Sequence, residues 1–361
     1  MALTEICERF GLQAPVFGFA HSIEAAAAIS RAGGLGVYGA TRDTPEEIRA
    51  NLARVRELAG DRPIGVDLVL PKGMPERDDR DAIEEQIPAE HREFVESLAA
   101  RYRVPPASGP GMRSRFVRSE DIAREQVEAV LESSIDLFAC GIGMPLEVVE
   151  RAKDQGMTTL ALVGAPHHAE AALAAGADVI VAQGHDAGAH TGPIGTLSLV
   201  PQIVDLAGDV PVLAAGGIAT GRQILAALAM GAQGVWLGTV WLTTEEHALD
   251  PILQDKLVAA GSRDTVISRA DSGKTLRQIR TSWSDEWAAE QAPEPLKMPY
   301  QDILVGDLLG AIDEHRVEPL MHQPAGQSIA YCREVSTVEE VMQRLMLELE
   351  QASAALPRLH A

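Results

Sequence analysis

Short apolar runs and helical segments alternate along most of the chain, and this alternation limits the folds that the sequence can adopt. Each apolar run is followed by a stretch with helix-capping residues or helical periodicity. Such a chain builds a parallel sheet, because a crossover helix must join each strand to the next. Eight strands favour a closed TIM (β/α)8 barrel over a doubly wound open sheet. The expected strands are 15–19, 35–38, 63–70, 135–140, 157–163, 178–182, 210–215 and 234–238.

Two further segments do not follow the alternation. Residues 71–118 are dense in charge and broken by Pro and Gly, which predicts a charged, helix-bearing surface insertion within the barrel; a lid over the site is the alternative. We expect residues 1–244 to form the barrel and 245–325 to form a mostly helical lid or substrate region near its mouth. Residues 326–361 would then supply a closing helix that packs back on the barrel.

The composition excludes several classes of partner. Lys and Arg number 31 against 52 Asp and Glu, and the formal charge of −21 disfavours nucleic acid and anionic membranes as partners. Three widely spaced cysteines indicate neither a disulfide framework nor a thiolate metal site. No apolar run reaches the roughly 20 residues that cross a bilayer, and the N-terminus has no signal-peptide pattern. We therefore expect a cytoplasmic protein, and its oligomeric state stays open.

The polar, glycine-rich stretch 182–192 follows the sixth expected strand and is the strongest candidate for chemistry. Small residues such as Gly188 allow a ligand to approach the backbone closely, and His190 stands directly behind them. His185 and Asp186 offer further polar groups, but one loop without an HExxH-like spacing is a poor metal site. We therefore predict that His190 is catalytic and that no metal is bound.

Two glycine turns follow the seventh and eighth expected strands. Gly216 and Gly217 precede a helix, and Gly238 precedes the hydroxyl of Thr239. In a TIM barrel these positions commonly hold a phosphate, although two ordinary turns would have the same sequence. One such site without a Rossmann unit for an adenine half favours FMN over FAD.

Other strand ends would supply a flat, hydrogen-bonding surface with few charges, which suits a flavin ring. The residues concerned are Gly18, Phe19, Asp67, Gln183 and Gly188.

Several motifs taken together resemble the nitronate monooxygenases, formerly called 2-nitropropane dioxygenases. These motifs are Ala-Gly-Gly-Leu-Gly at 32–36, Gly-Val-Asp-Leu-Val at 65–69, the histidine stretch at 182–192, Leu-Ala-Ala-Gly-Gly-Ile at 213–218, and Gly-Ala-Gln-Gly-Val-Trp-Leu-Gly-Thr at 231–239. The resemblance implies an FMN-binding TIM barrel that oxidises alkyl nitronates with O₂ to carbonyl compounds and nitrite, with His190 as the base. It implies flavin contacts at Asp67, Gln183, Gly188, Gly217, Trp236, Leu237, Gly238 and Thr239.

The chain departs from this family's usual pattern at Asp67, where Asn is usual, and at Ala189, where Gly is usual. Both departures bear on the choice of substrate. NAD(P)H-dependent reductases of quinones or of enoyl thioesters share the barrel and the histidine loop, so a reductase is the alternative function. A non-enzymatic FMN-binding protein is a weaker alternative, because it leaves His190 without a role.

Overall fold

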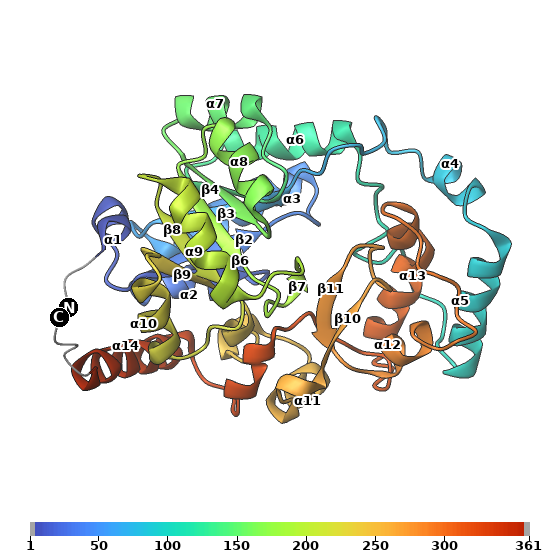
Figure 1. Cartoon of the computed structure of the whole chain (residues 1–361). Helices are drawn as coiled ribbons and strands as arrows, with labels where there is room; N and C mark the ends of the chain where they lie inside the picture. Colours follow the sequence, from blue (N-terminus) through green and yellow to red (C-terminus); the bar gives the residue numbers. More distant parts are fainter. Residues whose placement is uncertain (1–3, 357–361) are drawn as a thin grey trace.

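The computed structural model describes residues 4–356, which form two lobes (Figure 1). The larger lobe is a closed barrel of eight parallel strands surrounded by helices. The smaller lobe lies beyond the carboxyl ends of these strands, across the short strand β7 (Ala189–His190). The expected TIM (β/α)8 barrel is confirmed.

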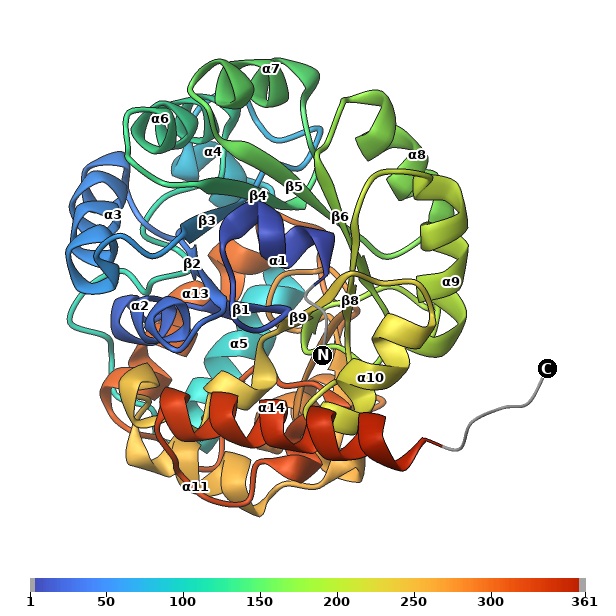
Figure 2. The same ribbon diagram turned by 90° about the vertical axis from the view of Figure 1, so that its left-hand side faces the viewer.

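The barrel closes because β1 pairs in parallel with both β2 and β9. Every other pair of hydrogen-bonded neighbours in the barrel consists of barrel strands that follow one another along the chain. Figure 2 shows the ring of strands end-on, with the outer helices around it. The observed strand ends differ from the expected ones by no more than two residues. The barrel strands are β1 (Val16–Ala20), β2 (Leu35–Gly39), β3 (Ile64–Val69), β4 (Leu137–Ile142), β5 (Thr158–Val163), β6 (Val179–Gln183), β8 (Val212–Ala215) and β9 (Gly234–Leu237).

Local capping signals fix where several barrel helices begin. The Thr44 side chain accepts from the Glu47 N–H, while the Glu47 carboxylate accepts from the Thr44 N–H. Thr220 and Thr337 each form a reciprocal pair of this kind with the residue three positions further along the chain. The barrel helices are α2 (Ile23–Arg31), α3 (Pro45–Ala59), α6 (Glu120–Leu131), α7 (Leu146–Asp154), α8 (Pro166–Ala174), α9 (Thr196–Ala207), α10 (Gly221–Ala229) and α14 (Val338–Ala355), and α1 (Glu5–Phe10) lies at the amino end.

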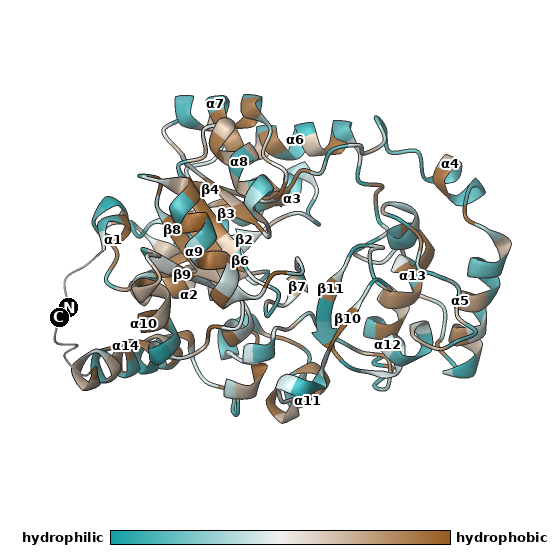
Figure 3. Cartoon of the chain, viewed as in Figure 1, coloured by the Kyte–Doolittle hydropathy of each residue, from teal (hydrophilic) through white to brown (hydrophobic). Residues whose placement is uncertain are grey.

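Apolar side chains fill the barrel in two layers. Phe17, Leu160 and Val181 are fully buried in one cluster inside the ring, and a larger cluster lies between the strands and the helices. The outer layer is tight: a Cβ on Gly36 would lie 1.8 Å from the Ala26 carbonyl oxygen, so glycine is required for α2 to pack on β2. Figure 3 shows apolar residues concentrated on the barrel strands.

The smaller lobe combines segments far apart in the sequence. Its sheet has the order β10-β11-β7, so the histidine loop after β6 supplies one of its edges. Its elements are β10 (Thr265–Ser268), β11 (Leu276–Ile279), α11 (Pro251–Ala259), α12 (Ser282–Trp287), α13 (Tyr300–Glu314), α4 (Arg80–Glu85) and α5 (Ala89–Arg101). Short 3-10 helices are η1 (Thr239–Trp241), η2 (Glu245–His247), η3 (Ser262–Asp264) and η4 (Gln327–Tyr331).

The charged insertion 71–118 is not the solvated decoration that its composition predicts. Leu98 of α5 is fully buried in one cluster with Trp283 and Leu309, and Ile83 of α4 packs in another with Ile303. The prediction was wrong because charged residues on the outer faces of α4 and α5 mask an apolar face. The partner of that face, α13, lies about two hundred residues further along the chain.

The C-terminal helix α14 packs on α10 and α2 of the barrel. A Cβ on Gly221 would lie 2.0 Å from the Leu349 backbone nitrogen, so the two helices approach to backbone contact at that point. Among residues 4–356, no helix has the length and hydropathy needed to cross a bilayer.

Candidate active site

The loop after β6 is held by its own polar groups. Asp186 accepts a hydrogen bond from the Thr196 N–H at 3.1 Å, and a ring nitrogen of His185 lies 2.8 Å from the Gly192 carbonyl oxygen. The Arg277 guanidinium donates to the His185 carbonyl oxygen. His185 and Asp186 therefore shape the loop, and no group of three or more His, Cys, Asp or Glu in the described part of the chain is arranged to hold a metal ion.

The glycines of this loop are needed for chain packing. A Cβ on Gly184 would lie 2.2 Å from the Thr196 hydroxyl, and one on Gly188 would lie 2.7 Å from the Ala325 carbonyl carbon. The sequence predicts that these small residues let a ligand approach the backbone. The structure instead shows that they let the loop fit against α9 and the segment before η4.

His190 lies on β7, opposite Leu276 of β11, and β7 lies between the two lobes in Figure 1. Its Nε2 is 2.9 Å from the Ser272 hydroxyl, and its carbonyl oxygen accepts from the Gln183 side chain at 2.7 Å. Burial, together with the positive charges of Lys274 and of nearby arginines, lowers the pKa of His190 to about 4. At neutral pH its imidazole is uncharged.

Asp67 lies near the end of β3 and is buried. Its Oδ1 has no hydrogen-bond partner among the described residues, while the carboxylate accepts from the Gly141 N–H. Burial raises the pKa of Asp67 well above its usual range, and the charge of Arg118 opposes this rise only in part. An unpartnered buried oxygen is costly in an isolated protein, so this atom is a candidate ligand contact.

The two predicted phosphate turns differ in the structure. The N-terminus of α10 is already satisfied, because Thr220 and Gln223 cap it and Glu348 accepts from the Gly221 N–H at 2.8 Å. This helix begins four residues after Gly217 and is not the open anion site that the sequence suggested.

The N–H groups of Gly217 and Gly238 are nevertheless free. Within the described residues, neither donates to a protein acceptor. A Cβ on Gly238 would meet nothing within 4 Å, whereas Gly216 and Gly217 have φ values of 99° and 74° that favour glycine. Thr239 begins η1, and its hydroxyl accepts from the Gly326 N–H at 2.9 Å. These donors fit a phosphate at the β8 and β9 ends of the barrel.

Four of the predicted flavin contacts lie on β1 and β9. The rings of Phe19 and Trp236 stack with centroids 5.9 Å apart. The side-chain positions of Gly18 and Leu237 lie outside the barrel interior. A Cβ on Gly18 would clash with Ile29 and Trp241, and the Leu237 side chain belongs to the outer core layer. Only the backbones of these two residues are left for a ligand.

A cavity of about 920 Å³ opens beside the mouth, between the ends of β4 to β6 and the smaller lobe. Among the residues predicted for the site, Gln183 and His190 line it. Gly188 lies in the loop after β6, and the remaining predicted residues are at the carboxyl ends of β1, β3, β8 and β9, around the same end of the barrel.

Sequence reasoning missed the polar groups that the smaller lobe and the insertion contribute. Arg118 is buried and donates to the Val69 carbonyl oxygen at 2.9 Å, with its pKa lowered to about 10 by burial and by Arg42. Arg113 pairs with the buried Asp271 at 3.1 Å. The one sequence feature that could have indicated these groups is the polar turn 271–274 between two short strands. The neighbouring sequence does not show that this turn lies over the barrel.

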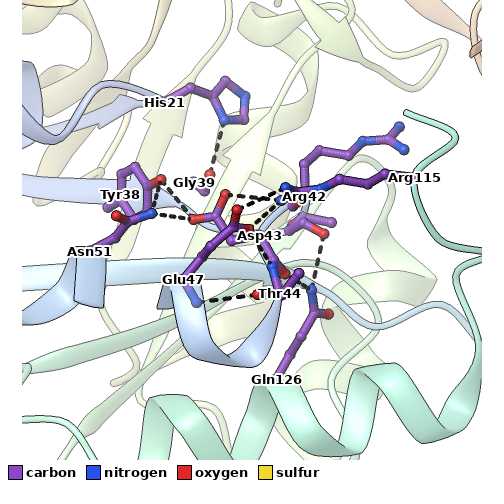
Figure 4. A network of polar contacts seen from close by, with 11 residues as sticks. His21, Tyr38, Gly39, Arg42, Asp43, Thr44, Glu47, Asn51, Arg115 and Gln126 are labelled. Carbon is purple, nitrogen blue, oxygen red and sulfur yellow. Dashed lines mark hydrogen bonds and ion pairs between the residues drawn. The ribbon is translucent and has the colours of Figure 1, made fainter. Parts of the chain in front are cut away.

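The loop after β2 is clamped between the lobes by a polar network (Figure 4). Asp43 accepts from the Tyr38 hydroxyl at 2.7 Å and from Asn51 at 2.9 Å, and Arg115 of the insertion binds Glu47. On the other side, Arg42 donates to Asp302 of α13 at 3.0 Å. These contacts fix the smaller lobe over the strand ends.

Comparison with known proteins decides the family. The model of the family described as "Nitronate monooxygenase" matches residues 1–348. The chain belongs to the nitronate monooxygenase family. It is therefore an enzyme from a family of flavin-dependent oxidoreductases that use FMN and act on small molecules.

Individual proteins are similar over most of the chain. "Putative monooxygenase Rv1533" from Mycobacterium tuberculosis is 42% identical over 343 residues, covering 92% of this chain and 89% of that protein. A "Probable nitronate monooxygenase" from Staphylococcus aureus is 29% identical over 322 residues, covering 84% of each chain. The nitroalkane oxidase from Streptomyces ansochromogenes has a similar structure, with a TM-score of 0.81, 28% identity and coverage of 96% of this chain and 98% of that one.

A solved structure with a different name is similar as well. FabK from Thermotoga maritima matches with a TM-score of 0.75 and 26% identity, covering 98% of each chain.

The structure gives a physical account of one departure from the family's usual pattern. Ala189, where the family usually has Gly, has a φ of 58° in the left-handed region. Alanine tolerates this conformation at a cost of about 1–2 kcal/mol, so the loop keeps its shape without the glycine.

Proposed function

We propose that the protein binds FMN and oxidises alkyl nitronates with O₂ to carbonyl compounds and nitrite. One observation carries the proposal: the unpartnered Oδ1 of Asp67 and the free N–H groups of Gly217 and Gly238 surround the barrel mouth, beside the cavity that His190 lines. A flat ligand with a phosphate arm would satisfy all of these groups together. FMN, when bound, supplies the acceptor that takes electrons from the nitronate and passes them to O₂.

The residues of the mouth divide between holding FMN and acting on the substrate. Gly217, Gly238 and Thr239 would hold the phosphate through backbone N–H groups, and Asp67 and Gln183 would hydrogen-bond the ring. Asp67 can take the place of the asparagine that is usual in the family, because its raised pKa favours the protonated carboxyl, which donates a hydrogen bond as a side-chain amide does.

His190 would remove the α-proton when the substrate is a neutral nitroalkane. Its imidazole is uncharged at neutral pH and so is ready to accept a proton. The Ser272 hydroxyl, 2.9 Å from Nε2, would orient the ring.

Release of the chromophore tests the cofactor. The purified protein should be yellow, and denaturation should release FMN that chromatography separates from FAD. Release of FAD, or no flavin uptake after reconstitution, would contradict the cofactor assignment.

A reductase that takes electrons from NADH or NADPH is the second candidate, because the barrel and the histidine loop of this chain also resemble those of NAD(P)H-dependent reductases. Anaerobic mixing of the flavin-loaded protein with each nucleotide separates the two functions. We expect no fast bleaching of the flavin by either nucleotide, and turnover of propyl nitronate with O₂ alone. Fast bleaching would support the reductase.

A further inference from the structure

One wall of the cavity beside His190 is apolar. It is built from the β4–α7 connection, the end of β5 and the inner side of α8, and includes Ile142, Met144, Leu162 and Ala172. Leu146, the first residue of α7, also lines it and is 54% exposed. A large apolar side chain left exposed in a concave site favours an apolar ligand.

All the charged side chains that line the cavity, histidines aside, are cations. They are Lys72 of the insertion and Arg269 and Lys274 of the smaller lobe, and no Asp or Glu lines the cavity. The whole chain carries a formal charge of −21, so a cavity free of acids is not expected from composition. The local charge therefore favours an anionic ligand.

Lys274 is the cation best placed to bind such an anion. It lies two residues after Ser272, whose hydroxyl contacts His190, and its charge acts on the imidazole. Its ammonium forms no ion pair among the described residues, although the more distant charge of Asp302 acts on it. In contrast, Arg269 already donates to the Gly273 and Pro295 carbonyl oxygens, and Lys72 is exposed.

We propose that this cavity binds linear amphiphilic anions, with a planar two-oxygen head on Lys274 beside His190 and an alkyl chain along the apolar wall. The inference rests on the proposed function, because an alkyl nitronate is an anion of this kind. It specifies that the preferred nitronates have longer alkyl chains than those of nitroethane or nitropropane. A fatty carboxylate has the same planar head and chain and cannot be oxidised by loss of nitrite, so it serves as a binding probe.

Direct binding to the flavin-loaded protein measures both parts of this proposal. Titration calorimetry with sodium butyrate, sodium octanoate and octanamide should show octanoate binding most tightly. Each buried methylene is expected to improve the dissociation constant about fourfold, and the ion pair about tenfold. Equal affinities for octanoate and octanamide would overturn the assignment of the charged head, and equal affinities for octanoate and butyrate would overturn that of the chain.

Variants of Lys274 identify the counter-ion. Lys274→Met should weaken octanoate binding about tenfold and leave octanamide unchanged, whereas Lys274→Arg should restore most of the loss. Lys256→Met is the matched control, because Lys256 lies on α11 outside the cavity and pairs with Glu318. Unchanged octanoate binding in Lys274→Met would overturn the role of Lys274.

Turnover separates this inference from the function on which it rests. The value of kcat/KM should be higher for the nitronate of 1-nitrooctane than for that of nitroethane, and Lys274→Met should lower the first more than Lys256→Met does. Octanoate binding through Lys274 without oxidation of any nitronate would support the cavity assignment and overturn the proposed function. Nitronate oxidation with a kcat/KM that does not depend on chain length would support the proposed function and overturn the cavity assignment.

Discussion

At the scale of single residues, His190 differs from what its residue type implies. A histidine that is exposed to water has a pKa of about 6.5. In the structure, burial and the charges of Lys274, Arg113 and Arg118 lower that pKa to about 4, and Asp302 opposes them only in part. The imidazole is therefore already unprotonated throughout the neutral range, and protonation would block the proposed base only in acid.

The pH dependence of nitroalkane oxidation should show this shift. A base must be unprotonated, so kcat/KM for neutral nitroethane should fall only as the pH decreases toward about 4, and should have no His190-dependent limb between pH 5.5 and 8. The measurement is a kcat/KM profile, which reports the pKa of the free enzyme. An acidic limb centred near 6.5 would show that the imidazole is not shielded as described.

Replacing the imidazole tests the role of His190 directly. His190→Asn should keep FMN bound, because the proposed phosphate and ring contacts lie elsewhere, but should lower turnover of neutral nitroalkanes about 10²- to 10⁴-fold. The loss with a preformed nitronate should be much smaller, since no proton has to be removed. His168→Asn is the control, because His168 also lines the cavity. Equal losses on both substrates would rule out His190 as the proton acceptor.

The backbone next to His190 allows a stability test. Ala189→Gly relieves the left-handed strain at a φ of 58°, but also gives the unfolded chain more freedom, which costs about 0.4–1 kcal/mol. We expect a net gain of up to about 1 kcal/mol in the free energy of unfolding, measured with denaturant. Ala187→Gly is the control and should destabilise, because Ala187 is buried and has no positive φ.

At the scale of elements, long periodic segments were predictable and short non-local ones were not. Each barrel strand follows from an apolar run bounded by turn residues, and Asp67, Gln183 and Gly238 could be grouped because parallel strands end at one edge. The two residues of β7 pair with β11, nearly ninety positions away, and carry no signal of their own. Ser272 and Lys274 reach His190 only through that pairing, so sequence alone could not place them in the site.

The packing of the insertion is open to a test at the same scale. Leu98→Ala removes a fully buried side chain between α5 and the tryptophans of α12, and should lower the free energy of unfolding by about 2–5 kcal/mol. The fluorescence of Trp283 and Trp287 would report the loss. The neighbouring Ser97→Ala should change stability little, since Ser97 is exposed. A Leu98 variant as stable as the Ser97 variant would return the insertion to the status of a surface decoration.

At the scale of the whole molecule, two lobes enclose a site that neither completes alone. The barrel supplies Asp67, Gln183 and the glycine turns, and the smaller lobe supplies Ser272 and Lys274. Charged contacts hold the lobes together near the site, among them the pair of Arg42 with Asp302. Buried pairs of this kind give less net stability than apolar contacts, but separating their partners is costly.

The Arg42–Asp302 pair makes that cost measurable. Asp302 is 2% exposed and its Oδ2 has no partner within the described residues, so Arg42→Met would leave a buried carboxylate without its ion-pair partner. We expect this variant to lose about 3 kcal/mol of the free energy of unfolding. Adding Asp302→Asn removes the stranded charge, so the double variant should be more stable than the sum of the single changes by about 1–3 kcal/mol. Additive losses in denaturant unfolding would mean that the two side chains do not join the lobes.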